Sequence, residues 1–92
     1  MAKNFKNSEA VMQELRPLIA GALCNGNGAD GINLGTDLRK NFHVLNQRMR
    51  DLGVEVAAHF GCEIAPQEAQ GWRTPNDIID ALVKKSVVSY NG

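Results

Sequence analysis

The residue types that could bind a metal are few in this chain, and their spacing is poor for it. His59 and Cys62 stand three residues apart, while the other histidine and cysteine, His43 and Cys24, lie elsewhere. A structural zinc site needs four such ligands in paired short spacings, and this sequence offers one loose pair. We therefore expect no metal site, and we interpret Cys62 as a partly buried thiol beside an edge histidine.

Candidates for covalent or acid–base catalysis are equally sparse. The three serines, Ser8, Ser86 and Ser89, lie near the ends of the chain, and none follows the strand-to-helix turn of a nucleophile elbow. Glu55 and His59 are i,i+4 neighbours, a spacing more typical of pairing on a helix surface than of an acid–base dyad. The sequence therefore predicts a protein that is not an enzyme.

A glycine-rich stretch from Asn25 to Asp37 imitates two ligand-binding motifs. Residues 26–31 spell G-x-G-x-x-G, but the dinucleotide site needs this motif between a strand and a helix, and here it follows a helix. If Gly31 is the obligatory glycine of a calcium loop, Gly26 and Gly28 occupy the positions of the first two oxygen ligands. Glycine has no side-chain oxygen, so the stretch is not an EF-hand calcium loop. The stretch is therefore interpreted as a long loop, which is either functional or mobile at this length.

The composition predicts a globular protein without a broad electrostatic attraction to any partner. The chain has 92 residues, 43% of them hydrophobic and 22% charged, and its formal net charge is zero. We expect one domain over residues 1–92, with an ordered core from about 8 to 85 and an unassigned tail at 86–92. Zero net charge argues against nucleic-acid and membrane partners, and no stretch approaches the roughly 20 apolar residues of a membrane span. A cytoplasmic location with reduced thiols is expected.

Apolar residues at helical spacing predict three main helices. The first begins with Ser8 as its N-cap, and Pro17 inside it predicts a kink or a frayed first turn. The last begins at Thr74-Pro75, an N-cap followed by the proline favoured at the first helical position. The buried positions expected in the first and last helices are Val11, Met12, Leu15, Leu18, Ile19, Ala22, Leu23, Ile78, Ile79, Leu82 and Val83.

The central helix has the clearest pattern. Its apolar stripe ends before Gly61, which supplies a left-handed stop, and Gly53 weakens the helix by up to about 1 kcal/mol. A short turn of helix at 66–70 and a core anchor at Trp72 complete an all-α fold, a small three- or four-helix bundle with a long loop after the first helix. The residues of the central stripe are Leu45, Met49, Leu52, Val56 and Phe60.

Positive charge gathers around the start of the central helix. Between Thr36 and Arg50 the only acidic residue is Asp37, and the four cations, here named the basic cluster, are Arg39, Lys40, Arg48 and Arg50. Such a cluster is either an ordinary solvated surface or a docking face for an acidic partner.

A set of residues with a recognisable spacing runs along the chain from about 36 to 82, namely Thr36-Asp37-Leu38, Leu52, Val56, Phe60-Gly61, Glu63-Ile64, Ala69, Trp72, Thr74, Ile79-Asp80 and Leu82. With these residues aligned, the chain resembles the acyl carrier protein family, the four-helix carriers of fatty-acid and polyketide synthesis. This register holds without a gap from about 36 to 82, and the first helix matches in pattern only.

The chain departs from that family at the residue that carries its chemistry. In the family an Asp-Ser-Leu triplet opens the second helix, and the serine hydroxyl carries phosphopantetheine, whereas the matching positions here read Leu45-Asn46-Gln47. The amide of Asn46 cannot attack a phosphoryl group as a hydroxyl does, so phosphopantetheine is expected to be absent. Asn46 could still cap the helix by accepting a hydrogen bond from the backbone N–H of Arg48 or Met49.

A second departure concerns charge, since family members usually present an acidic second helix to basic enzyme surfaces. Here Arg48 and Arg50 stand beside Asp51 and Glu55, and the arginines would repel such a surface. The leading hypothesis is therefore an acyl-carrier-like domain without a prosthetic group that acts through protein–protein contacts. Its expected partner is a biosynthetic synthase, a ligase or a regulatory protein, docking on the basic cluster with Asn46 at the centre.

Two alternatives stay open. The first is a working acyl carrier with an atypical attachment point or non-covalent loading, in which Met49, Val56 and Ile79 would line an acyl cavity. The second is a small helical nucleic-acid binder that uses the basic cluster, although the chain lacks a helix-turn-helix spacing and four cations give only modest non-specific affinity.

Overall fold

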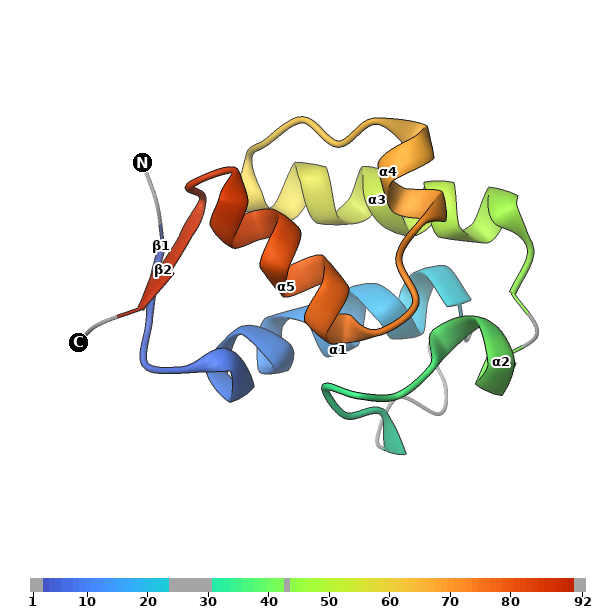
Figure 1. The fold of residues 1–92 in the computed structure, drawn as a ribbon, viewed down its shortest axis with the longest axis horizontal. Coiled ribbons are helices and arrows are strands. Elements are labelled where there is room, and N and C mark those ends of the chain that lie inside the picture. The colour runs from blue at the N-terminus through green and yellow to red at the C-terminus, as the bar shows by residue number, and fades with distance from the viewer. Residues whose placement is uncertain (1–2, 24–30, 43, 91–92) are drawn as a thin grey trace.

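The computed structural model describes residues 3–23, 31–42 and 44–90, so Cys24, His43 and the motif at 26–31, except Gly31, lie outside the described residues. Three longer helices form the body, α1 and α3 running in opposite directions and α5 crossing in front of them (Figure 1). The elements in chain order are β1 (Lys3–Phe5), α1 (Ser8–Leu23), α2 (Leu38–Phe42), α3 (Asn46–Phe60), α4 (Pro66–Gln70), α5 (Pro75–Lys84) and β2 (Val88–Tyr90).

The fold is mostly helical, but the expectation of an all-α protein is wrong in one respect. Strands β1 and β2 pair in parallel, with Lys3 opposite Val88 and Phe5 opposite Tyr90. The N–H of Lys3 donates to the carbonyl of Val87 at 2.9 Å. Both strands lie outside the expected core of 8–85, yet Phe5 and Val88 are buried in the hydrophobic core. Burial of these two side chains therefore holds both strands against the helices.

Helix α1 begins one residue away from the expected cap. The side chain of Asn7, not Ser8, accepts a hydrogen bond from the N–H of Ala10 at 3.1 Å, as an N-cap residue does. The Ser8 hydroxyl instead lies 3.2 Å from the Tyr90 hydroxyl, next to β2. The helix continues from Ser8 to Leu23 with Pro17 on its exposed side.

Helix α3 packs closely against the short helix α4. Gly53 is buried at the middle of α3, where a Cβ atom would lie 2.6 Å from the Cβ of Ala69 in α4. The glycine that we expected only to weaken the helix therefore permits this approach. Gly61 ends α3 in the left-handed conformation with φ 71°, which confirms the expected stop. Leu45 is 74% exposed, so its predicted place in the buried stripe is wrong.

Helix α5 begins as predicted, with Thr74 as N-cap and Pro75 in the first turn. The Thr74 hydroxyl accepts from the N–H of Asp77, whose carboxylate accepts from the N–H of Thr74 in return. The carbonyl of Leu34 accepts from the N–H of Asn76 at 3.1 Å, which fixes the end of the long loop on this helix. Trp72 is a buried core anchor as expected, whereas Val83 is 40% exposed and lies outside the core.

The described part of the long loop is anchored to the helical body. Ile32 is buried, and the guanidinium of Arg16 donates two hydrogen bonds to its carbonyl, at 2.9 and 3.2 Å. Asp37 then caps the short helix α2, an element that the sequence patterns did not predict, by accepting from the N–H of Lys40. Within the described ranges, no helix has the length and apolar character needed to cross a membrane.

Candidate functional site

Asn46 is the first residue of α3, but it does not cap the helix. The N-cap residue is Leu45, and no side chain caps this end. The carbonyl of Leu45 accepts from the N–H groups of Arg48 at 3.0 Å and Met49 at 3.3 Å, the donors that Asn46 was expected to satisfy. The predicted capping role is therefore wrong, and the Asn46 side chain is exposed at the end of the helix.

The basic cluster is not four equivalent free charges. The guanidinium of Arg39 donates to the carbonyl of Gln70 at the end of α4 at 2.7 Å, and Arg48 donates to the carbonyl of Ala22 near the end of α1 at 3.4 Å. The last carbonyls of a helix lack partners within it and carry partial negative charge, so both arginines stabilise a helix end. Lys40 and Arg50 are exposed and make no ion pair with the described residues.

The three residues expected to line an acyl cavity belong to the core. Met49 and Val56 are fully buried in α3, and Ile79 of α5 is 2% exposed. They pack within one hydrophobic cluster with the other helices. Neither of the two surface hollows described below is lined by any of the three, so the residues fill the interior of the bundle instead of facing an opening.

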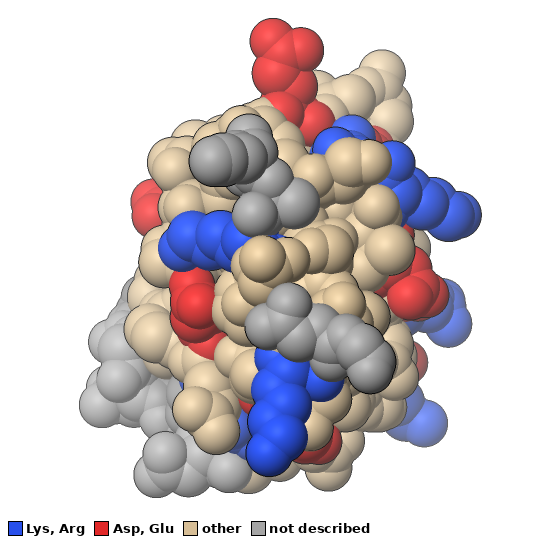
Figure 2. Space-filling model, turned by 90° about the vertical axis from the view of Figure 1, so that its left-hand side faces the viewer, with Lys and Arg blue, Asp and Glu red and all other residues tan. Residues whose placement is uncertain are grey.

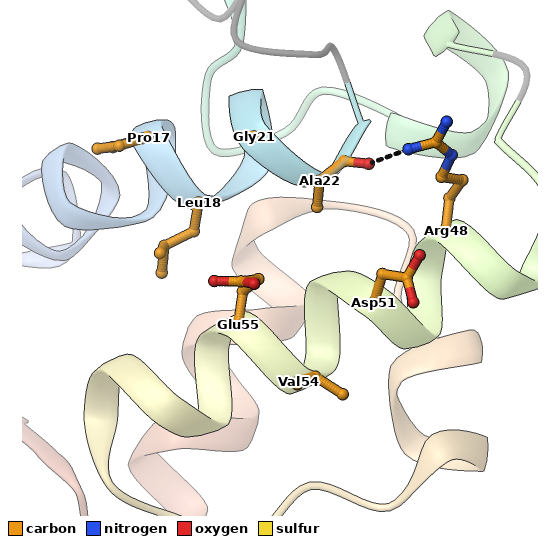
Figure 3. Close-up of a pocket in the computed structure, with 8 residues that line it drawn as sticks. All are labelled: Pro17, Leu18, Gly21, Ala22, Arg48, Asp51, Val54 and Glu55. Carbon is orange, nitrogen blue, oxygen red and sulfur yellow. Dashed lines mark hydrogen bonds between the residues drawn. The ribbon is translucent and has the colours of Figure 1, made fainter.

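The first hollow is a groove of about 440 Å³ between the second half of α1 and the middle of α3 (Figure 3). The side chains of Asp51 and Glu55 extend from α3 toward α1, and Leu18 points from α1 toward α3. We name this hollow the α1–α3 groove. The residues that line it are Pro17, Leu18, Gly21, Ala22, Arg48, Asp51, Val54 and Glu55.

The second hollow lies between α4 and α5 and contains an ion pair. The ammonium of Lys85 lies 2.9 Å from the carboxylate of Glu68, with both side chains about 30% exposed. Cys62 is half-buried nearby, and burial raises the pKa of its thiol, opposed by the positive charge of Lys85 and reinforced by the negative charge of Glu68. A thiol with a raised pKa is a poor nucleophile at neutral pH, because little thiolate is present.

His59 pairs with α1 instead of with its neighbour on α3. Its Nε2 lies 2.8 Å from Oε1 of Glu14, which also accepts from the ammonium of Lys3 at 3.3 Å. The hydrogen bond from His59 is the main cause that lowers the pKa of Glu14; burial opposes it, and the hydrogen bond and charge of Lys3 lower the pKa further. The expected surface pairing of Glu55 with His59 is therefore wrong, because the tertiary contact takes the imidazole.

The end of the molecule that carries the strands shows no single sign of charge. Lysine and arginine side chains are interspersed there with aspartate and glutamate (Figure 2). Among the described residues no group of three or more histidine, cysteine, aspartate or glutamate side chains is arranged to hold a metal ion. Comparison with known protein families gives no matching model, and a search of curated protein sequences gives no match either.

Proposed function

We propose that this chain is an acyl-carrier-like helical domain without a phosphopantetheine group, and that it acts by contact with another protein. The observation that carries the proposal is Asn46, an exposed amide at the first position of α3. When the chain is aligned with the acyl carrier protein family, this position corresponds to the serine that carries phosphopantetheine. The hydroxyl that the transfer reaction needs is absent from it, while the start of the helix is kept.

The order and spacing of the helices support the same proposal. Two long helices, α1 and α3, are followed by the short α4 and the capped α5, with the long loop between the first two. Leu45, beside Asn46, is 74% exposed, so an apolar side chain next to this position is open to contact with another protein. A biosynthetic synthase or ligase is the expected kind of partner.

Non-covalent loading with an acyl chain is not favoured by any observation. Its expected lining of Met49, Val56 and Ile79 is packed inside the core, so an acyl chain would have to displace core side chains to reach it. The nucleic-acid alternative is weakened as well, because Arg39 and Arg48 of the basic cluster are bonded to helix carbonyls.

The test is incubation with a phosphopantetheinyl transferase and coenzyme A, followed by the intact mass of the protein. We expect no mass gain for the wild-type chain. A matched variant, Leu45→Asp with Asn46→Ser and Gln47→Leu, restores the triplet of the family at an exposed helix start. A stoichiometric gain in this variant alone would support the acyl-carrier-like fold, whereas the same gain in the wild type would overturn the proposal.

A further inference from the structure

Positive charge gathers where the short helix α2 meets the link between α4 and α5. Arg39 of α2 donates to the carbonyl of Gln70 at 2.7 Å, and the N–H of Leu38 donates to the carbonyl of Arg73 at 2.7 Å. These two hydrogen bonds hold α2 beside the link, although the two segments are far apart in the sequence. Lys40 and Arg73 are exposed, and neither forms an ion pair with any residue in the described ranges.

Arg50 of α3 belongs to the same surface. It stands three residues before Gly53, so both lie on one flank of the helix. That flank packs against α4, where a Cβ atom on Gly53 would lie 2.6 Å from the Cβ of Ala69. Helices α2 and α4 and the first turns of α3 lie at one end of the molecule (Figure 1). We name this end the α2–α4 surface, and its cations are Arg39, Lys40, Arg50 and Arg73.

Two carboxylates lie near these cations, and both are bonded to backbone groups. Asp37 accepts from the N–H of Lys40 at 3.0 Å, and Asp77 accepts from the N–H of Arg73 at 2.9 Å. Four cations against two carboxylates leave an excess of two positive charges on the surface. An acidic partner is therefore attracted to it, and a basic partner is repelled.

The remaining charges of α3 and α4 are paired or face another side. Glu68 of α4 is paired with Lys85 at 2.9 Å in the second hollow. The side chains that line the α1–α3 groove carry one positive and two negative charges, and they face α1 instead of α4 (Figure 3). These three residues are Arg48, Asp51 and Glu55. The positive excess of the α2–α4 surface is therefore not cancelled on its own side of α3.

We propose that the α2–α4 surface binds an acidic segment of a partner protein that also carries an apolar side chain. This inference rests on the proposed function, because it names the chemistry of the protein that the domain contacts. Arg50 and Arg73 can each hold a carboxylate through two parallel hydrogen bonds. Leu45, 74% exposed at the same end of α3 as Arg50, offers the apolar contact. Such a partner has the opposite charge to the basic enzyme surfaces that acyl carrier proteins usually meet.

The make-up of the surface favours a protein segment over other occupants. Proteins that bind nucleic acids gain affinity from many phosphate contacts and from exposed aromatic side chains, whereas this surface has an excess of two charges beside a leucine. The nearby aromatic residues Phe42 and Trp72 are half-buried and buried. A second copy of this chain could present Asp51 and Glu55, so the experiment must separate this alternative.

The experiment is a titration of the isotope-labelled full chain, followed by the amide resonances in NMR spectra. The probe is a synthetic peptide in which glutamates flank leucines. We expect saturable shifts confined to residues 38–40, 45–50 and 70–73, weakened by added salt because the attraction is partly electrostatic. A peptide with lysines in place of the glutamates should give no shifts. If a DNA duplex or anionic vesicles shifted these residues at lower concentration than the acidic peptide, the surface would bind phosphate groups and the proposal would fail.

Three variants make the test specific. Arg50→Gln with Arg73→Gln should weaken binding by about tenfold, because two ion pairs with the peptide are lost. The equal charge change Lys6→Gln with Lys84→Gln, at exposed residues outside the surface, should leave the affinity within about twofold. Leu45→Ser should also weaken binding, without a change of charge. All of these side chains are exposed, so each variant should keep the urea denaturation midpoint of the wild type.

The outcomes are distinct from those of the phosphopantetheinyl transfer experiment. Absence of saturable binding, or an equal loss in both charge variants, would overturn the proposal. Self-association seen as concentration-dependent sedimentation without peptide, and abolished by Asp51→Asn with Glu55→Gln, would overturn it in favour of a second copy as occupant. None of these results adds a mass to the wild-type chain, so the proposed function would stand or fall separately.

Discussion

Substitution of Gly53 by alanine should destabilise the protein, although the same change stabilises most helices. In an exposed helix interior, glycine to alanine gains about 1 kcal/mol. Here the new Cβ would lie 2.6 Å from the Cβ of Ala69, well inside the 3.5–4.0 Å at which carbon atoms attract each other. Both atoms are fixed to helix backbones, so relief requires α3 and α4 to move apart by about 1 Å. Overpacking of this kind costs about 1–3 kcal/mol.

The expected net loss is about 1–2 kcal/mol in the free energy of unfolding, measured by urea denaturation with the slope unchanged. Gly21→Ala in α1 is the matched control, because nothing lies within 4 Å of its added Cβ, and it should gain up to about 1 kcal/mol. In an Ala69→Gly background the clash is removed, so Gly53→Ala should become neutral or stabilising. If Gly53→Ala alone were as stable as the wild type, the close approach of α3 and α4 would be refuted.

Three further changes test separate features. Ser86 has φ 61°, a left-handed conformation that costs a serine more than a glycine, so Ser86→Gly should raise the free energy of unfolding by about 0.5–1 kcal/mol in urea denaturation; a lower free energy of unfolding would contradict the strain. Because the pKa of Glu14 is lowered, its carboxylate stabilises the fold above the ordinary glutamate pKa of about 4.3, and this contribution is lost as pH falls through the lowered value. Glu14→Gln should thus lower the free energy of unfolding slightly at pH 7 and not at about pH 2, and a difference that grows on acidification would count against the pairing with His59. Burial raises the pKa of the Cys62 thiol, so in a Cys24→Ser variant Cys62 should be alkylated more slowly than free cysteine at about pH 7.5. Equal alkylation rates before and after unfolding in urea would contradict this prediction.

The features of the fold that could be predicted from the sequence are those whose signal is local. Thr74-Pro75 starts α5 and Gly61 ends α3 because each acts on backbone groups within a few residues. Trp72 is buried because a side chain of that size is rarely left in water. The Ser8 cap was displaced by one residue, since Asn7 offers the same kind of acceptor one position earlier.

The features that could not be predicted depend on residues far apart in the chain. Lys3–Phe5 and Val88–Tyr90 are each too short to show a strand pattern, and they become strands only because the helices bring them together. The pairing of His59 with Glu14 likewise depends on the contact of α3 with α1.

For the candidate site, the sequence located Asn46 at the start of α3, but it gave no sign of the tertiary hydrogen bonds of Arg39 and Arg48. The α1–α3 groove was not predicted either, because Asp51 and Glu55 line the same hollow as Leu18 only after α1 packs on α3. One signal could have pointed to it, namely that the carboxylates stand one turn apart beside the apolar Val54.

The parallel pairing of β1 with β2 has a mechanical consequence. Tension applied along the chain through Lys3 and Tyr90 would pull the two strands in opposite directions along their own length, because they point the same way. Hydrogen bonds loaded in shear share the force and must break together, whereas in an antiparallel hairpin pulled at its open end they separate one at a time. The short strand pair would therefore act as a clamp that protects α1 and α5 until it yields, with the buried Phe5 and Val88 resisting the first displacement.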